Sequence, residues 1–271
     1  MRRFPSAAVA VVPAVAVAAA LALRQPSSAL VWGLGCGVGH ALVRSGFGFA
    51  SGYRGLIERR DPHPVFAQLL LAALLVIAMA LVLAAEPLTG LQPKLLATPL
   101  SLPFLVGAFL FGIGMERARA CGCGTLAATS RGGTGVLAAL AGLIIGAFLG
   151  TLHAPQLAAL PLPRLPSPVG LELFGLLGAL SLQLAFIALI TVLLARWSGQ
   201  VPWRSPSRRL YGGAIAVALL ATGLLVVTAE PWKVLWGLAL SGAHAAQALG
   251  WDPGGSLFWS SPRGQALLTG P

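Results

Sequence analysis

Long apolar runs with almost no charge decide what this chain can fold into. The clearest, residues 64–85, reads PVFAQLLLAALLVIAMALVLAA and contains no charged side chain. A helix needs about 20 mostly apolar residues to cross the hydrocarbon core of a bilayer, so this run is long enough to span it. Similar runs cover residues 6–23, 134–152, 169–195 and 211–228, and we predict a full span at each. The fold class is therefore predicted to be an all-α integral membrane protein, a polytopic bundle.

The amino-acid composition argues against a soluble protein. Only 9% of the 271 residues are charged and 57% are hydrophobic, whereas soluble chains carry roughly 25% charged residues. Glycine and proline are abundant, but they lie within the apolar runs, as is common in membrane helices that pack closely. We expect one transmembrane domain over residues 1–271. The first run also resembles a signal peptide, but no clear small-residue cleavage site follows it, which favours a span.

Positive charge is distributed unevenly between the two ends of the predicted spans. With the N-terminus in the cytoplasm, thirteen arginines fall at the cytoplasmic level and four cations on the far side. This positive-inside bias predicts a multi-pass protein with a cytoplasmic N-terminus, and it relates the net charge of +11 to topology and to contact with the lipid bilayer. No basic face of a soluble module is present, so we expect no nucleic-acid partner. The thirteen are Arg2, Arg3, Arg44, Arg54, Arg59, Arg60, Arg117, Arg119, Arg131, Arg196, Arg204, Arg208 and Arg209; the four are Arg24, Lys94, Arg164 and Lys233.

Two segments that interrupt the apolar pattern resemble each other. They are loops at about residues 33–56 and 112–135. Each has a Gly-x-Gly at the end of a short apolar stretch, then a basic residue, a cluster of small residues and a second arginine. We predict short, re-entrant broken helices here and an inverted or internal repeat. Three segments are too short or too rich in glycine for ordinary spans, at 28–56, 101–130 and 231–249.

Superposing the two loops suggests where a site lies. Placing Gly37 on Gly112 puts Gly46 opposite Cys121 and Gly48 opposite Cys123. Irregular backbone at membrane depth is tolerated only where protein buries it or where it lines a wet cavity. Paired broken helices indicate a transport site, because the N-termini of half-helices direct free N–H groups at an anion. The alternative is that the glycines serve helix packing and the arginines lie at the membrane interface.

Three cysteines, Cys36, Cys121 and Cys123, offer chemistry. A disulfide between Cys121 and Cys123 would close a very small, strained loop. No His or acidic residue accompanies them at ligand spacing, so we expect no metal site. No base stands beside a thiol, and the Gly-x-Gly pairs follow apolar helices, so we expect neither an enzyme nor a dinucleotide cofactor. A thiol in a glycine-rich loop near cations can donate a weak S–H hydrogen bond to a soft anion, whereas Cys36 is interpreted as packing.

The second loop, FGIGMERARACGCGTLAATSRGG, resembles the YeeE/YedE family of sulfur-transport membrane proteins, which includes thiosulfate importers. The family's Gly-Cys-x-x-Gly-Thr-Leu element matches at Cys121, Gly124, Thr125 and Leu126. Residues 230–252 resemble a later segment of the family, in which Pro-Trp leads into an amphipathic helix. Further matches in the second loop are Arg131, Gly132 and Gly133. The matches in the upstream loop are Arg44, Ser45, Gly46, Phe47 and Arg54.

The chain also departs from this family pattern. Gly48 stands where the family's first loop has cysteine, Ala120 stands where glycine is usual, and Cys123 is an additional thiol. Family members continue through a C-terminal half with a further Gly-Cys loop, which we expect to be missing after Pro271.

The resemblance implies a permease of the bacterial inner membrane that passes a small sulfur-containing anion, thiosulfate first of all, through a pore by thiol hydrogen bonding. Cys121 is then the thiol that contacts substrate. We expect no catalytic residue. Two alternatives stay open: a membrane sulfur-relay or redox protein that uses Cys121 and Cys123 and passes sulfur to a cytoplasmic sulfur-carrier protein, or a non-transporting truncated paralogue. The other expected substrate-binding residues shape the loops or supply positive potential: Gly48, Gly122, Gly124 and Thr125; Arg44, Arg54, Arg117 and Arg119.

Overall fold

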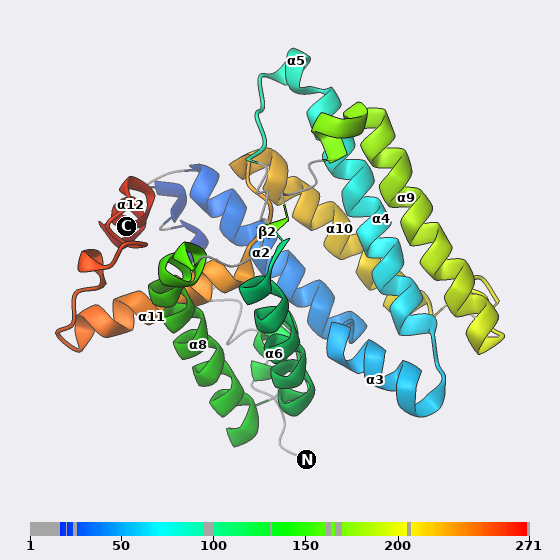
Figure 1. Ribbon diagram of the computed structural model, residues 1–271, viewed down its shortest axis with the longest axis horizontal. Coiled ribbons are helices and arrows are strands. Elements are labelled where there is room, and N and C mark those ends of the chain that lie inside the picture. The colour runs from blue at the N-terminus through cyan, green and yellow to red at the C-terminus, as the bar shows by residue number, and fades with distance from the viewer. Residues whose placement is uncertain are drawn as a thin grey trace.

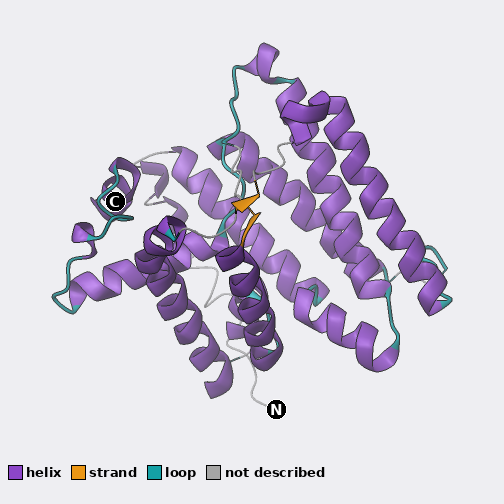
Figure 2. Ribbon diagram, in the orientation of Figure 1, coloured by secondary structure: helices purple, strands orange, loops and turns teal. Residues whose placement is uncertain are grey.

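The fold is helical over almost all of the residues that the structure describes (Figure 2). The predicted span at 6–23 lies mostly outside those residues, as do Arg2, Arg3, Arg24 and Arg131. The computed structural model describes residues 17–19, 21–23, 26–94, 100–130, 132–160, 164–165, 170–204 and 207–269.

Four of these helices are long and apolar enough to cross a membrane. They coincide with four of the five predicted full spans, and the all-α polytopic fold class is confirmed. The outer two, α8 and α9, bury very little of their surface within the protein, as expected of helices that face lipid. The helix α9 is bent at Gly175, whose φ of +67° is not helical. The four are α4 (His63–Ala84), α8 (Thr134–Ala159), α9 (Gly170–Ser198) and α10 (Arg208–Thr228).

One group of helices forms the larger core of the protein. The helix α2 (Pro26–Ser45) packs along α10, α10 packs on α4, and α4 packs on α9 (Figure 1). Val38 of α2 and Ala214 of α10 are fully buried in this core. A Cβ atom added at Gly213 of α10 would lie only 2.2 Å from Ser45 Cβ, so glycine is required where α10 crosses the end of α2. This contact fixes the point at which the first loop begins.

A second group consists of α6 (Leu102–Ala118), α8, α11 (Val234–Ala248) and α12 (Pro262–Thr269). The helix α11 packs on α8, where a Cβ at Gly242 would lie 2.6 Å from Phe148 Cβ. The chain then folds back so that Trp259 is fully buried and its Nε1 donates to Thr151 Oγ1 at 2.9 Å. The smaller elements are α5 (Glu86–Thr89), η1 (Pro253–Gly255) and an antiparallel pair of two-residue strands, β1 (Leu100–Ser101) and β2 (Arg164–Leu165).

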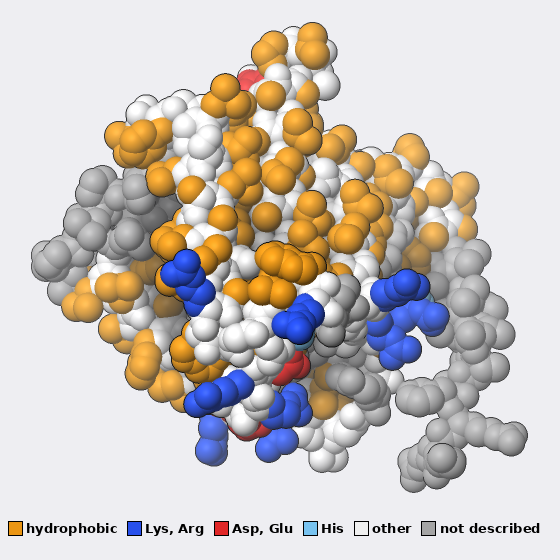
Figure 3. Space-filling model, turned by 90° about the vertical axis from the view of Figure 1, so that its right-hand side faces the viewer, with side chains coloured by type: hydrophobic (Ala, Val, Ile, Leu, Met, Phe, Trp, Pro, Cys, Tyr) orange, Lys and Arg blue, Asp and Glu red, His pale blue; other side chains and the backbone are white. Residues whose placement is uncertain are grey.

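Two short helices interrupt the bundle: α3 (Phe49–Arg59) begins within the first predicted loop, and α7 (Gly122–Thr129) lies within the second. Basic side chains gather at the end of the molecule where α3 lies, below a broad apolar band (Figure 3). Contacts hold this end together: the Arg60 guanidinium lies 5.8 Å from the Trp197 ring centroid, and Gln200 Nε2 donates to the Arg60 carbonyl at 3.3 Å. The uneven distribution of charge seen in the sequence is therefore a spatial feature, and the cytoplasmic N-terminus inferred from it stays a prediction.

Candidate functional site

The two loops follow the same backbone path. After α2, Gly46 adopts a left-handed φ of +66° and Gly48 is extended before α3 begins. After α6, Arg119 adopts a left-handed φ of +56° and Cys121 is extended before α7 begins. Each loop thus has a left-handed turn residue, then one intervening residue, then an extended residue that is the N-cap of a short helix. This shared geometry supports the predicted internal repeat.

The geometry also corrects the register proposed from the sequence. The backbone pairs Gly46 with Arg119 and Gly48 with Cys121, so the alignment of Gly37 with Gly112 was wrong by two residues. The turn residue Gly46 comes nine positions after Gly37, whereas Arg119 comes seven positions after Gly112, and the turn itself defines the equivalence. Gly48 therefore occupies the position in the first loop that the cysteine occupies in the second.

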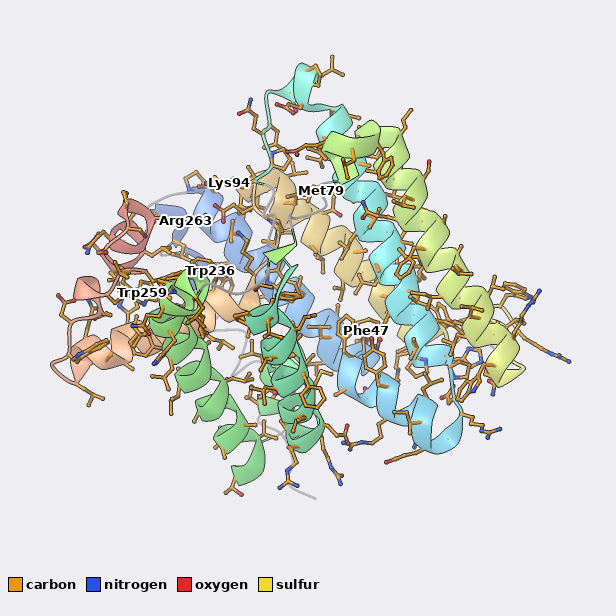
Figure 4. All side chains as sticks on the ribbon, in the orientation of Figure 1. Phe47, Met79, Lys94, Trp236, Trp259 and Arg263 are labelled. Carbon is orange, nitrogen blue, oxygen red and sulfur yellow. The ribbon has the colours of Figure 1, made fainter. Side chains whose placement is uncertain are left out.

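The two turns converge on one cavity of about 540 Å³. Phe47, between the turn residue and the N-cap of the first loop, is buried in the core of α2, α4 and α10 and anchors this side of the cavity (Figure 4). Glycine and alanine make up most of the lining, which leaves backbone groups accessible. The lining glycines are Gly46, Gly48, Gly124, Gly132, Gly133 and Gly135.

The Cys121 thiol lies where the two short helices begin. Its Sγ accepts a hydrogen bond from the Gly124 amide at 3.4 Å, which makes the thiol the N-cap of α7. The amide of Phe49, the first residue of α3, is directed at the same sulfur. Gly48, the N-cap of α3, has no side chain to offer. Two helix N-termini, each with partial positive charge and N–H groups that lack helical partners, therefore face the thiol.

Arg119 is the charged side chain that the structure brings to this cavity. Among the described residues that line it, none is acidic. The Arg119 side chain is exposed and forms no ion pair with the described part of the chain. The cavity thus combines a thiol, two helix N-termini and an uncompensated guanidinium, which favours an anion over a cation.

Arg54 has a different place from the one predicted. Its Nη2 donates to the Glu116 carboxylate and, at 3.1 Å, to the Glu116 carbonyl at the end of α6. The positive charge is therefore paired, and Arg54 connects α3 to α6 outside the cavity lining. Arg44 and Arg117, in the last turns of α2 and α6, are exposed and also lie outside the lining.

The remaining predicted residues of α7 divide between two faces. Gly124 lines the cavity, whereas Gly122 is buried toward α11, where an added Cβ would lie 3.5 Å from Leu235 Cδ2. Thr125 is 1% exposed, and its hydroxyl has no hydrogen-bond partner among the described residues. Cys123 packs against the core of α2, α4 and α10.

Gln68 is a site residue that the sequence analysis missed. It is 5% exposed within α4, and its Nε2 donates to the carbonyls of Gly48 at 3.1 Å and Phe49 at 3.4 Å. A Cβ at Gly52 of α3 would lie 2.4 Å from this nitrogen, so glycine is needed for the approach. The signal was present, because Gln68 is the one polar amide in the apolar run 64–85, and such groups usually bond between helices.

A family model described as sulphur transport matches residues 44–269, which covers both loops and the cavity. The chain belongs to the sulphur transport family, the YeeE/YedE family. The comparisons with curated proteins and with solved structures found no match.

Membership of the sulphur transport family makes the chain a sulfur-related membrane transport protein. Cys121, Arg119 and Gly48, which the structure gathers around one cavity, all lie within the matched residues. The family assignment and the geometry therefore single out the same part of the molecule.

Proposed function

We propose that this sulphur transport family member carries a small sulfur-containing anion, most favourably thiosulfate, across the bacterial inner membrane through the cavity between its two turns. The observation that carries the proposal is the position of Cys121. Its sulfur lies where the N-termini of α3 and α7 meet, in a cavity that also exposes Arg119. Cys121 contacts the substrate, and Gly48 and Gly124 keep the neighbouring backbone accessible.

The chemistry of the site suits transient contact. A transported anion must bind well enough to enter and weakly enough to leave. A thiol is a weak hydrogen-bond donor, and it suits the large terminal sulfur of thiosulfate, while backbone amides and Arg119 suit its oxygens. Arg54 would bind an oxyanion more firmly, but Glu116 already occupies it. The site therefore offers several weak donors and one exposed cation.

The position of the cavity within the molecule indicates the side of the membrane on which it lies. The first turn leads directly into α3, which lies at the end of the molecule where basic side chains gather (Figures 1 and 3). The positive-inside rule places such an end at the cytoplasmic face. The cavity is then the last station before substrate reaches the cytoplasm, and the N-terminus is cytoplasmic.

Uptake by purified protein tests this proposal. We expect Cys121→Ala to lose uptake of radiolabelled thiosulfate into proteoliposomes while it inserts and elutes as the wild type does. Cys36→Ser is the matched control, because Cys36 lies on an exposed face of α2 outside the cavity, and it should keep wild-type uptake. Uptake by Cys121→Ala equal to that of Cys36→Ser would refute the assignment.

A sulfur relay is the second candidate, and one contact favours it. The Cys123 thiol is directed at the Cys121 sulfur, so the two thiols form a neighbouring pair. A relay to a cytoplasmic sulfur-carrier protein requires Cys123→Ser to be as damaging as Cys121→Ser, and a thiol-trapping reagent would capture a persulfide on the wild type. Transport through the cavity requires neither. A truncated, non-transporting paralogue predicts no uptake even by the wild type.

A further inference from the structure

An apolar groove crosses the outer surface of the second helix group, away from the cavity of Cys121. It has a volume of about 470 Å³ and lies between α6, α8 and α11. Gly142, Gly146 and Gly150, one turn apart on α8, line it together with Phe111 and Leu235. From Gly142 to the end of the groove at Ala154, α8 rises about 18 Å.

The three glycines of this groove pack against none of the described residues. A Cβ added at Gly142, Gly146 or Gly150 would meet no atom of the described part of the chain within 4 Å. Gly242 of α11 shows the contrast, since a Cβ there would collide with Phe148. The row on α8 therefore keeps a narrow apolar channel open on a surface that faces the bilayer.

Trp236 joins one end of the groove to a group of charged side chains. Its ring lines the groove, and the centroid lies 5.5 Å from the Arg263 guanidinium and 5.8 Å from Lys233 Nζ. Lys94, Arg263 and Trp236 lie near one another between α2, α11 and α12 (Figure 4). A tryptophan beside cations at the end of a span is typical of the interface between acyl chains and headgroups.

The cations at this end outnumber their partners. Lys94, Lys233 and Arg263 all contact a single carboxylate, that of Glu230, at 2.9, 3.5 and 2.6 Å. The hydrogen bond from Lys94 lowers the pKa of Glu230, with Arg263 and Lys233 acting in the same direction, so the carboxylate stays ionised. Three positive charges and one negative charge leave a net charge of +2.

We propose that the groove and this cation cluster form a binding site for an anionic phospholipid. One acyl chain lies along the glycine row, and the phosphate contacts Lys94, Lys233 and Arg263. Lys and Arg side chains beside a tryptophan at the edge of the apolar region lie at the depth of the headgroups, where a lipid phosphate can accept their hydrogen bonds. The net charge argues against a second copy of the chain, because a two-fold contact over this groove would bring two clusters of charge +2 together. The site does not depend on the proposed transport function.

Quenching of tryptophan fluorescence by brominated lipids tests the site. Purified protein in detergent is titrated with dibrominated phosphatidylglycerol and, separately, with dibrominated phosphatidylcholine. We expect saturable quenching at lower concentrations of the anionic lipid, and Trp236→Phe should remove most of that component. Each neutralised cation should weaken anionic-lipid binding about fivefold, so Lys233→Gln/Arg263→Gln should weaken it about 25-fold.

Three further variants separate charge, shape and fold. Glu230→Gln raises the net charge of the cluster and should tighten anionic-lipid binding, although it removes the partner of three cations. Gly146→Leu fills the groove and should weaken binding of both lipids, whereas Gly107→Leu on the exposed surface of α6 should leave both unchanged. Equal affinity for the two lipids, or an unchanged preference in Lys233→Gln/Arg263→Gln, would overturn the proposal. A self-association of the wild type that Gly146→Leu abolishes, without any preference for the anionic lipid, would instead assign the groove to a second copy.

Discussion

Replacement of Gly52 by alanine isolates the contact that holds α3 in place. The new Cβ would lie 2.4 Å from Gln68 Nε2, so the amide must move and its hydrogen bonds to Gly48 and Phe49 are lost. Each bond contributes about 1 kcal/mol, and the Gly48 carbonyl keeps its hydrogen bonds from the Gly52 amide and the Ser51 hydroxyl. Alanine in a helix returns about 0.5–1 kcal/mol. The loss of two bonds exceeds this gain, so we expect a net loss of roughly 1–1.5 kcal/mol in stability.

Gly55→Ala is a matched control for this experiment. It makes the same change in the same helix at another buried glycine, and its Cβ would meet only the end of the Arg59 side chain at 3.5 Å. Thermal unfolding in detergent should therefore rank Gly55→Ala at or above the wild type and Gly52→Ala below it, by roughly 2–6 °C. Thiosulfate uptake should fall in Gly52→Ala alone, because the turn of Gly48 loses its support. Identical melting of the two variants would refute the role given to Gln68.

Three further predictions concern other contacts. Arg54→Gln and Glu116→Gln should each destabilise the protein, and a double-mutant cycle by thermal unfolding should give a coupling of about 0.5–1 kcal/mol, since the pair is partly exposed; additive effects would contradict a connection between α3 and α6. Thr125→Val removes a buried hydroxyl that has no hydrogen-bond partner in the described part of the chain, and it should raise stability by about 1 kcal/mol while uptake persists; lost uptake would instead place the hydroxyl on the transport path. Lys94 holds the pKa of Glu230 below its ordinary value, so the stability that this ionised group contributes is present at neutral pH and is lost as the pH falls through that lowered pKa. Melting curves of Glu230→Gln should lack that part of the acid dependence; an unchanged acid dependence would show that the contacts of Glu230 contribute nothing.

Much of the fold could be predicted because hydropathy reports which residues face lipid. The runs around α4, α8, α9 and α10 follow from the scarcity of charge alone, and the interruptions in the pattern marked both short helices. Cys121 drew attention because a thiol in a glycine-rich turn is unusual in an apolar sequence; the structure places it in the cavity lining, and its contact with substrate stays a prediction.

The lateral partners of individual side chains could not be predicted in the same way. The sequence predicted an unpaired Arg54, because its partner Glu116 lies 62 residues away in the chain and becomes a neighbour only when the two loops meet. The equivalence of Gly48 with Cys121 was missed because the two loops were aligned on their Gly-x-Gly pairs. What the fold repeats is the backbone turn, and the number of residues between the Gly-x-Gly pair and the turn differs between the two loops. Hydropathy gives the depth of a residue in the membrane, and it carries no information on which helix lies beside it.

The sulfur cap of α7 has a consequence for how a substrate would pass. Cys121 Sγ holds the Gly124 amide at 3.4 Å, and sulfur is a poor acceptor compared with the hydroxyl oxygen that usually caps a helix. An arriving oxyanion can replace the sulfur as acceptor of the Gly124 amide hydrogen bond at little cost in free energy, and the hydrogen bond to the thiol can form again after the anion has left. A serine hydroxyl at this position would accept a stronger hydrogen bond from the amide. Cys121→Ser would therefore stabilise α7, but an anion could no longer displace the capping atom easily.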